Sequence, residues 1–340
     1  MLPDRFESVE ALEAFMTEPD EALVEDLRRA PGDILILGVA GKMGPTLARM
    51  AKRAAPERRV IGVARFSDPR ARAALERAGV EALSCDLLDR KALEALPRCP
   101  NVVFMAGMKF GATGNEPLTW AMNVQVPAMV AETFAGSRIV AFSTGCVYPF
   151  VPVTGGGATE DTPAVPPAGD YAWSCLGRER MFQYFSGLHG TPGRLIRLNY
   201  AIDMRYGVLH DVAQKVFREE ELDLSMGHAN VIWQGDANAV ALRCFARATT
   251  PTSPLNVTGP ETIAIRRLAE AFGRLMGRKA RLVGTEAATG WLNDAGRMNA
   301  EFGYPRVPLA RMIEWTADWV VNDRESLGKP THYEVRDGRY

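Results

Sequence analysis

Three glycines near the start of the chain have the spacing of a phosphate-binding turn. Gly38, Gly41 and Gly44 follow the apolar run Ile34–Leu37, and Pro45 begins a stretch with the composition of a helix. A strand, a glycine turn and a helix in this order place a pyrophosphate at a helix N-terminus, where backbone N–H groups meet the anion. The first glycine permits the tight turn, the second lets the backbone approach the phosphates, and the third lets helix and strand pack closely. We therefore expect a dinucleotide-binding fold built around this turn.

The end of the next predicted strand bears on which dinucleotide is bound. The stretch RRVIGVARFS ends this strand at Ala64 and Arg65, and Arg70 and Arg72 lie just beyond. An acidic residue at this place binds the ribose 2′-hydroxyl of NAD, whereas a guanidinium suits a 2′-phosphate. Arg65 therefore favours NADP, with NAD as the alternative. The arginines also fit the solvated start of a helix.

The elements that must position these residues alternate along the chain. Further strands are expected at residues 80–84, 101–107, 138–150 and 194–202, and helices at 69–79, 90–96, 116–134 and 171–189, with a Gly- and Pro-rich loop at 152–170. This alternation predicts an α/β fold with a Rossmann-type doubly wound parallel sheet. Two helices at 8–16 and 18–29 precede it.

Beyond residue 203 the alternation weakens. Strands are expected at 229–233 and 254–257, and helices at 211–220, 236–247, 265–276, 293–301 and 309–322. We expect a smaller C-terminal α/β substrate domain over the carboxyl ends of the strands. The predicted organisation is an N-terminal helical extension (1–31), a dinucleotide-binding Rossmann domain (32–202) and a partly interleaved substrate-binding domain (203–340). The polar tail after Gly328 is expected to be a loose surface segment or a subunit contact.

Composition excludes several classes of protein. The formal net charge of −1 gives no electrostatic case for binding nucleic acid or an anionic membrane. No apolar run approaches membrane-spanning length, and the acidic, amphipathic N-terminus is not a targeting signal. The five cysteines are scattered, which predicts reduced thiols in the cytoplasm rather than a disulfide framework or a zinc site. The four histidines have no metal-binding spacing, so no metal is expected.

Hydroxyl groups follow a later strand and begin a later helix. Ser143 and Thr144 end the strand predicted at 138–150, and Tyr171 starts the helix after the following loop. Together with the glycine turn they make the sequence resemble the extended short-chain dehydrogenase/reductase family, the NAD(P)-dependent epimerase/dehydratase group that acts mostly on sugars and sugar nucleotides. The resemblance covers residues 32–325. Its motifs, in order, are GVAGKMG, CDLLD, MAG, AMNVQVP, STGCVY, YAWSCLGRE and WQGDANAVA.

The resemblance implies a role for each matching position. Tyr171 would be the general acid/base, Thr144 would orient the same substrate oxygen, Asp86 would receive the adenine amine and Asn123 would brace the site. Implied cofactor contacts are Gly38, Ala40, Gly41, Lys42, Met43, Gly44, Arg65, Asp86, Leu87, Met105, Ala106, Gly107, Lys109, Asn123, Ser143 and Tyr171. Implied substrate contacts are Cys146, Asn199, Tyr200, Arg205 and Trp233, of which Arg205 and Trp233 also fit structural positions.

One position departs from the family pattern in a way that affects the chemistry. The family has a lysine four residues after the tyrosine, and this chain has Cys175. The lysine binds the nicotinamide ribose and lowers the tyrosine pKa, which a neutral thiol does not do well. Another cation could substitute, with Lys109, Lys42 and Arg178 as candidates. Otherwise the enzyme works slowly or on an easily oxidised substrate, or the protein is a catalytically silent dinucleotide-binding sensor or scaffold.

The residues after Thr144 narrow the implied reaction. Family dehydratases carry an acidic residue there, whereas this chain has Gly145 and Cys146. This leaves epimerisation through a keto intermediate, or simple dehydrogenation or reduction, of a sugar, sugar nucleotide or sugar-derived polyol or acid. The implied partners are a small carbohydrate-type substrate and a second copy of the chain, in a homodimer formed through the catalytic-domain helices.

Overall fold

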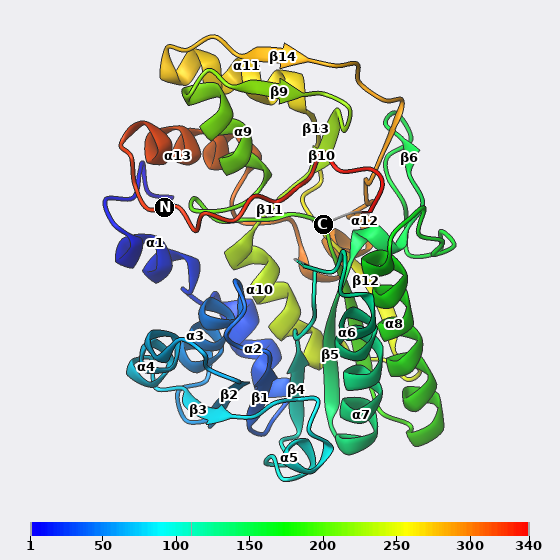
Figure 1. Ribbon diagram of the computed structural model, residues 1–340. Coiled ribbons are helices and arrows are strands. Elements are labelled where there is room, and N and C mark those ends of the chain that lie inside the picture. Colours follow the sequence, from blue (N-terminus) through cyan, green and yellow to red (C-terminus); the bar gives the residue numbers. More distant parts are fainter. Residues whose placement is uncertain (1, 110, 339–340) are drawn as a thin grey trace.

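The central sheet is parallel and carries the predicted doubly wound topology. The computed structural model describes residues 2–109 and 111–338, and within these ranges seven strands form one sheet in the order β12-β7-β5-β4-β1-β2-β3 (Figure 1). Their bounds are β1 Ile34–Leu37, β2 Val60–Ala64, β3 Glu81–Ser84, β4 Asn101–Phe104, β5 Arg138–Thr144, β7 Gly193–Leu198 and β12 Ser253–Val257. Every adjacent pair is parallel. The Rossmann-type fold predicted from the sequence is confirmed.

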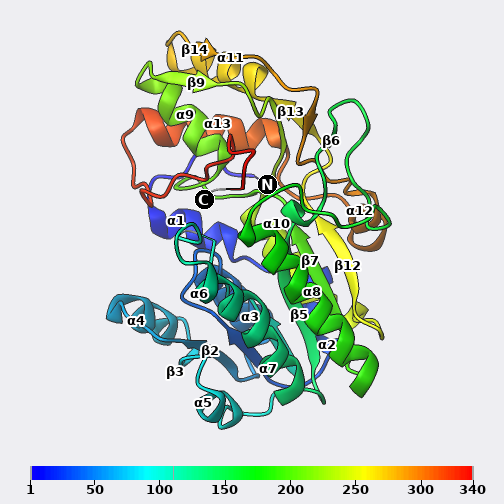
Figure 2. The same ribbon diagram turned by 45° about the vertical axis from the view of Figure 1, so that its right-hand side comes forward.

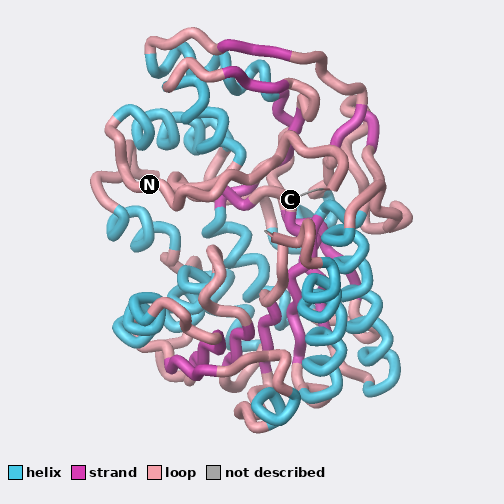
Figure 3. The backbone as a smooth tube through the Cα atoms, in the orientation of Figure 1, coloured by secondary structure: helices cyan, strands magenta, loops and turns pink. Residues whose placement is uncertain are grey.

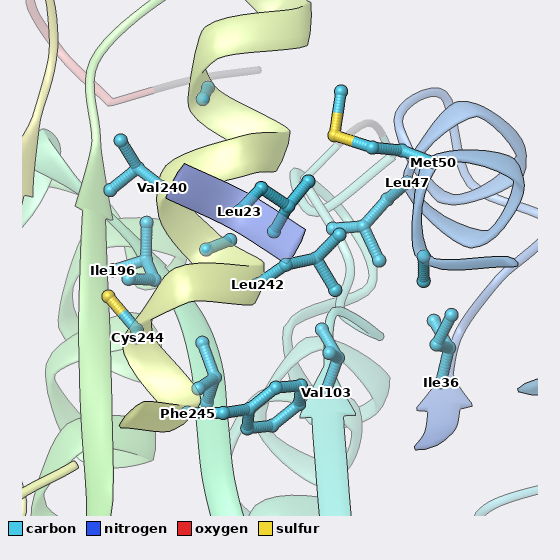
Figure 4. Packing of buried hydrophobic residues seen from close by; sticks show 14 of the residues in the cluster. Leu23, Ile36, Leu47, Met50, Val103, Ile196, Val240, Leu242, Cys244 and Phe245 are labelled. Atoms are coloured by element: carbon cyan, nitrogen blue, oxygen red, sulfur yellow. The ribbon is translucent and has the colours of Figure 1, made fainter. Parts of the chain in front are cut away.

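Helices cover both faces of this sheet, which explains the uninterrupted apolar run of β1. Ile34 and Ile36 pack toward α2 (Glu21–Arg29), α3 (Gly44–Ala54) and α10 (Gln234–Arg243). Leu35 and Leu37 pack toward α5 (Arg90–Glu94), α7 (Val126–Thr133) and α8 (Asp170–His189). Figure 4 shows the first of these cores, with Leu23, Leu47, Met50 and Leu242 around Ile36 and Val103. A strand buried on both faces has no polar side to present.

A smaller part of the molecule lies over one end of the sheet (Figures 1 and 2). Its helices are α9 (Val208–Phe217), α11 (Ile265–Met276) and α13 (Leu309–Val321), which form a second core with α1 (Val9–Met16). Short strands pair around it: β8 (Ala201–Ile202) with β11 (Ile232–Trp233), β10 (His228–Asn230) with β13 (Thr262–Ala264), and β9 (Glu221–Asp223) with β14 (Arg281–Val283). At its edge lie β6 (Val151–Pro152), β15 (Thr289–Gly290) and α12 (Gly296–Phe302).

The chain returns to the large sheet after leaving it. The strand expected at 254–257 in the smaller part is β12, and it pairs with β7 in the central sheet. Helix α10 likewise packs on α2 and α3, on the face of the sheet. The boundary near residue 202 stays a prediction, because both parts draw on residues from beyond it.

The long helix expected at 116–134 contains a wider turn. It consists of α6 (Glu116–Trp120), a π-helical turn at Ala121–Gln125, and α7. Pro127 has no N–H to offer the carbonyl four residues earlier, which removes one α-helical hydrogen bond at this place. The π turn carries Asn123, which is fully buried.

Two loops differ from expectation near the same end of the sheet. The strand expected at 194–202 is divided into β7 and β8, because Tyr200 has a φ of 44°. The tail expected to be loose after Gly328 is packed instead, with Thr331 and Tyr333 each 2 % exposed. It crosses the molecule without helix or strand (Figure 3). No helix in the described ranges is long and apolar enough to cross a membrane.

Candidate active site

The glycine turn has the close backbone contacts that its spacing predicts. Gly38 has a φ of 89°, and a Cβ placed there would lie 2.6 Å from the backbone nitrogen of Ala106. A Cβ on Gly44 would collide with the carbonyl of Val39, so this glycine lets α3 pack against the turn. Around Gly41, by contrast, a Cβ would meet only the Gly38 carbonyl, at 3.5 Å. The turn therefore packs tightly against its neighbours at Gly38 and Gly44, and it leaves open space at Gly41, where a phosphate can approach.

A cavity of about 290 Å³ lies on one side of the turn, beside the ends of β2 and β3. Arg65 and Asp86 both line it, so the structure brings together these two predicted cofactor contacts. Arg70 and Arg72 do not line it: Arg70 pairs with Asp68, the N-cap of α4 (Pro69–Arg77), and Arg72 pairs with Glu76 one turn further along that helix. The described lining is Gly38, Ala40, Gly41, Ala64, Arg65, Phe66, Ser67, Cys85, Asp86, Leu87, Met105, Ala106, Gly107 and Met122.

A second cavity of about 270 Å³ continues from the first, since Gly41 and Met105 line both. Its lining includes residues from the end of β5, the start of α8, the β7–β8 loop and the C-terminal tail. The described lining is Gly41, Lys42, Met43, Met105, Lys109, Phe142, Ser143, Thr144, Cys146, Tyr171, Leu198, Asn199, Tyr200, Ala201, Tyr206, Gly207 and Thr331. A long ligand can therefore extend from Arg65 across the glycine turn to Tyr171.

Thr144 and Tyr171 both line this second cavity. The Thr144 side chain acts to lower the pKa of Tyr171, and Tyr171 acts to lower the pKa of the Cys175 thiol. Burial raises the pKa of Tyr171 well above its usual 10, and burial raises the pKa of Cys175 to about 11. Tyr171 is thus a phenol and Cys175 a thiol at neutral pH. Cys175 is fully buried and does not line the cavity.

A guanidinium lies next to this pair, one helical turn beyond Cys175. Arg178 is 6 % exposed, and it donates to the Phe142 carbonyl at 2.8 Å and to Asn123 Oδ1 at 2.6 Å. Its charge acts to lower the pKa of Tyr171 and of Cys175, although burial outweighs it at both. Arg178 is one of the three predicted substitutes for the family lysine, and its charge acts on the tyrosine.

Asn123 holds the loop after β4 in place. Its Oδ1 accepts from the Met108 N–H at 2.9 Å, and its Nδ2 donates to the Met108 carbonyl at 3.0 Å and to Ser174 Oγ at 3.0 Å. It lines neither cavity among the described residues. Asn123 therefore joins this loop to α8, and we assign it no direct cofactor contact. Gly44 also lies outside the cavities, because its role is the packing of α3.

The two lysines of the second cavity lie on different segments. Lys42 Nζ donates to the Ala201 carbonyl at 3.0 Å and lies 4.2 Å from the centre of the Tyr206 ring. Burial lowers the pKa of Lys42 to about 7. Lys109 Nζ donates to the Thr331 carbonyl at 3.1 Å, and burial lowers its pKa as well. Both side chains line the cavity that contains Tyr171.

A buried network supports the strand that carries Thr144. Ser143 Oγ donates to Glu179 Oε1 at 2.6 Å, and Arg197 donates to both oxygens of Glu179, at 3.0 Å and 2.7 Å. Arg197 also donates to the hydroxyl of Tyr148 at 2.7 Å. Glu179 lies two turns along α8 from Tyr171, so this network fixes β5 to α8.

The predicted substrate residues divide into two groups. Cys146, Asn199 and Tyr200 all line the cavity. Arg205 does not, because it pairs with Asp203 and Glu13. Trp233 is fully buried against Phe6, Phe15 and Trp315, in the second core. Arg205 and Trp233 are therefore corrected to structural residues of the smaller part.

Two lining residues had no signal in the sequence. Tyr206 follows the break after β8, and Thr331 belongs to the tail that had been expected to be loose. Only the fold shows that these segments meet. Within the described ranges there is no cluster of three or more His, Cys, Asp or Glu side chains that could hold a metal.

Comparisons with known proteins agree with this geometry. Residues 34–202 match the NAD dependent epimerase/dehydratase family. No curated protein matches the chain. The solved structure of MoeE5 in complex with UDP-glucose and NAD is similar at a TM-score of 0.68 and 18% identity, over 86% of this chain and 99% of that chain.

Two other solved structures share the fold at similarly low identity. UDP-glucuronic acid 4-epimerase from Bacillus cereus, in complex with UDP-glucuronic acid and NAD, is similar at a TM-score of 0.70 and 16% identity, over 85% of this chain and 99% of that chain. UDP-glucose 4-epimerase from Thermotoga maritima, with UDP-glucose, is similar at a TM-score of 0.69 and 16% identity, over 86% of this chain and 99% of that chain. The match over the Rossmann part, the glycine turn and the Thr144–Tyr171 pair lead to one conclusion: the chain belongs to the NAD dependent epimerase/dehydratase family.

Proposed function

We propose that the protein is an NAD(P)-dependent epimerase or oxidoreductase acting on a sugar or sugar derivative, with Tyr171 as the acid/base. The observation that carries this proposal is that Thr144 and Tyr171 line the same cavity, which is continuous with the glycine turn. A hydroxyl pair in this place can hold one substrate oxygen. Solved structures of the same fold include two named epimerases, one of them with NAD.

The residues present fit a dinucleotide. The glycine turn is open where a pyrophosphate would lie, and Arg65 and Asp86 line the cavity beyond it. We propose that the adenosine half lies in that cavity, and that Arg65 and Ser67 favour a 2′-phosphate and hence NADP over NAD. A nicotinamide bound beside Tyr171 supplies the hydride acceptor or donor.

The protonation state of Tyr171 determines how the chain's own groups act. Tyr171 is a phenol, so in the reducing direction its hydroxyl proton goes directly to the carbonyl oxygen of the substrate. Thr144 holds that oxygen in line with the phenol. The Arg178 charge stabilises the tyrosinate that remains, which is part of the work done in the family by the lysine that Cys175 replaces.

The residues after Thr144 favour epimerisation or simple dehydrogenation over dehydration. Gly145 and Cys146 offer no carboxylate there, and none of the described residues lining the cavity is an Asp or a Glu. A dehydration needs an additional acid or base at the sugar, whereas moving one hydride and one proton needs only Tyr171 and the cofactor.

The test is Tyr171→Phe. We expect this variant to keep NAD(P) affinity within about threefold and to lose turnover by about a hundredfold or more, because only the proton-transfer group is removed. Thr144→Val should give a smaller loss of the same kind. Full activity of Tyr171→Phe would contradict the mechanism.

A catalytically silent dinucleotide-binding sensor is the second candidate, because a thiol stands where the family has a cation. Mass spectrometry of the dinucleotide released from denatured protein separates the two. Stoichiometric bound cofactor favours an epimerase that recycles it, and reversible NADP(H) binding favours a dehydrogenase. Dinucleotide binding without turnover of any sugar in a panel favours the sensor. Activity created by Cys175→Lys would show that the natural protein is impaired in the ordinary chemistry, whereas loss of an existing activity in that variant would place Cys175 in a working site.

The location and assembly are proposals of the same kind. All five cysteines are free thiols, as expected of a cytoplasmic protein. Exposed apolar side chains gather on the outer sides of α6 and α8, and a homodimer through this face would cover them: Leu118, Trp120, Trp173, Tyr184 and Leu188. Light scattering of the purified protein and of a Tyr184→Glu/Leu188→Glu variant measures the dimer directly.

A further inference from the structure

The cavity that contains Tyr171 combines two lysine side chains with hydroxyl groups. Lys42 and Lys109 line it, together with the hydroxyls of Thr144, Tyr171 and Thr331. None of the described residues in its lining is acidic. Lysine is a point charge that binds carboxylates and phosphates, and hydroxyls suit a polyhydroxylated ligand. The lining therefore suits a ligand that is both a polyol and an anion.

Lys109 lines the same cavity as Thr144 and Tyr171. Its charge interacts with the thiols of Cys146 and Cys175, and both of these thiols act in turn on Tyr171. Asp211 and Glu334 also act on the charge of Lys109, and neither lines the cavity. An anion that meets Lys109 in this cavity therefore shares the cavity with the oxygen that Tyr171 protonates.

Contacts from the tail fix Lys109 in this place. Its ammonium donates to the Thr331 carbonyl at 3.1 Å, which positions the charge without neutralising it. The Thr331 N–H and hydroxyl donate to Asp211 Oδ2 at 2.8 Å and 2.5 Å, so the tail is itself anchored to α9. Burial raises the pKa of Asp211 and lowers that of Lys109, so both groups are poorly solvated. A negatively charged ligand would compensate for the desolvated ammonium.

Lys42 lies at the other side of the cavity and has a different environment. It belongs to the glycine turn, where the cofactor pyrophosphate is expected, and the carboxylate of Asp203 acts on its charge. Its bond to the Ala201 carbonyl ties the turn to the first residue of β8. The two lysines thus serve two anions: Lys42 the cofactor, and Lys109 the substrate.

We propose that Lys109 binds a carboxylate carried by the sugar itself, so that the substrate is a sugar acid of the aldonate or uronate class. This assignment rests on the proposed function, because it takes the oxygen beside Tyr171 as the reacting one. Lys109 and Tyr171 line one cavity of about 270 Å³, so a carboxylate on the sugar can meet Lys109 while a sugar oxygen lies beside Tyr171. The diphosphate of a sugar nucleotide, the other source of negative charge, is separated from that carbon by more of the sugar ring.

The experiment is calorimetric binding to the NADP-loaded full-length protein. The probes are aldonates and uronates of four to six carbons, the matching neutral sugars and alditols, and UDP-glucose. We expect at least one acid to bind about tenfold or more tightly than its neutral counterpart. Lys109→Met should lower the affinity for that acid by about ten- to a hundredfold, because one charged hydrogen bond is lost. The affinities for the neutral sugars should stay unchanged. Lys109→Arg should recover most of the affinity.

Lys42→Met is the matched control, because it removes the other ammonium of the same cavity. This variant should have a lower affinity for NADP, and its affinity for the acid should be unchanged once NADP saturates the protein. The proposal is overturned if no acid binds, if acids and neutral sugars bind alike, or if Lys109→Met weakens UDP-glucose as much as the acid. Binding of an acid that depends on Lys109, with turnover unaffected by Tyr171→Phe, would leave this proposal standing and remove the proposed mechanism.

Discussion

Removing the buried carboxylate of Glu179 should destabilise the protein far more than removing an exposed one. The side chains of Glu179 and Arg197 are 0% and 4% exposed, and Arg197 Nη2 lies 2.7 Å from Glu179 Oε2. Two more donors, Arg197 Nε at 3.0 Å and Ser143 Oγ at 2.6 Å, complete the carboxylate's hydrogen bonds. Glu179→Gln keeps the shape of the side chain but leaves the guanidinium with an uncompensated charge.

The expected cost follows from these distances. At an effective dielectric constant of about 20, two unit charges 2.7 Å apart attract each other by about 6 kcal/mol. Part of this is recovered, because the variant no longer has to desolvate a carboxylate. We therefore expect Glu179→Gln to lower the free energy of unfolding by about 3–5 kcal/mol, a large share of a typical total of about 5–15 kcal/mol.

Guanidinium unfolding followed by circular dichroism measures this change. The control is Glu132→Gln, which removes an ion pair with Arg90 of 3.0 Å whose side chains are 52% and 53% exposed. Solvent screens that pair, so its loss should cost less than about 1 kcal/mol. The double variant Glu179→Met/Arg197→Met should cost less than Glu179→Gln, since no buried charge is left alone. Equal costs for Glu179→Gln and Glu132→Gln would refute the reasoning.

Three further predictions concern other residues. Gly44→Ala should lower stability by about 1–3 kcal/mol in chemical denaturation, because its Cβ would meet the Val39 backbone, whereas Gly41→Ala, with open space, should lose NADP affinity at unchanged stability. Arg65→Ala should lower the affinity for NADP about tenfold or more and leave the affinity for NAD unchanged in calorimetric titrations. Equal effects on both affinities would contradict the 2′-phosphate assignment. Burial raises the pKa of Asp236 to about 6, so the folded state binds this proton more tightly than the unfolded state does. The free energy of unfolding of the wild type should therefore fall as the pH rises from about 4 to 6. Asp236→Asn should remove that decline and be more stable by about 1–3 kcal/mol at pH 8 in unfolding titrations; parallel stability curves would contradict it.

The parts of the fold that the sequence predicts are those whose signals are local. The four-residue run Ile34–Leu37 can be buried on both faces only in a covered parallel sheet, and the backbone approaches at Gly38 and Gly44 leave no room for a side chain. Thr144 and Tyr171 were identified through the family motifs STGCVY and YAWSCLGRE, and the parallel sheet brings both to the same cavity.

The parts that the sequence missed depend on contacts between distant segments. In the sequence, β12 has no feature that distinguishes it from other short strands. It belongs to the central sheet because it pairs with the edge of β7. Thr331 lies in a polar tail with no periodicity, and its place in the cavity depends on Asp211 and Lys109. The environment of Arg178 was hidden for a similar reason, since its partners are carbonyl and amide oxygens of other elements.

The place of β12 has a consequence for how this protein can be made and divided. β7 is an interior strand only while β12 pairs with it, and the face over α2 and α3 is closed by α10. A fragment ending near residue 202 would expose the edge of β7, and unpaired strand edges are surfaces on which chains aggregate. During synthesis, the sheet likewise cannot be completed until residue 257 has left the ribosome. The part that holds the cofactor is therefore not expected to fold by itself, although it makes up a recognisable family unit.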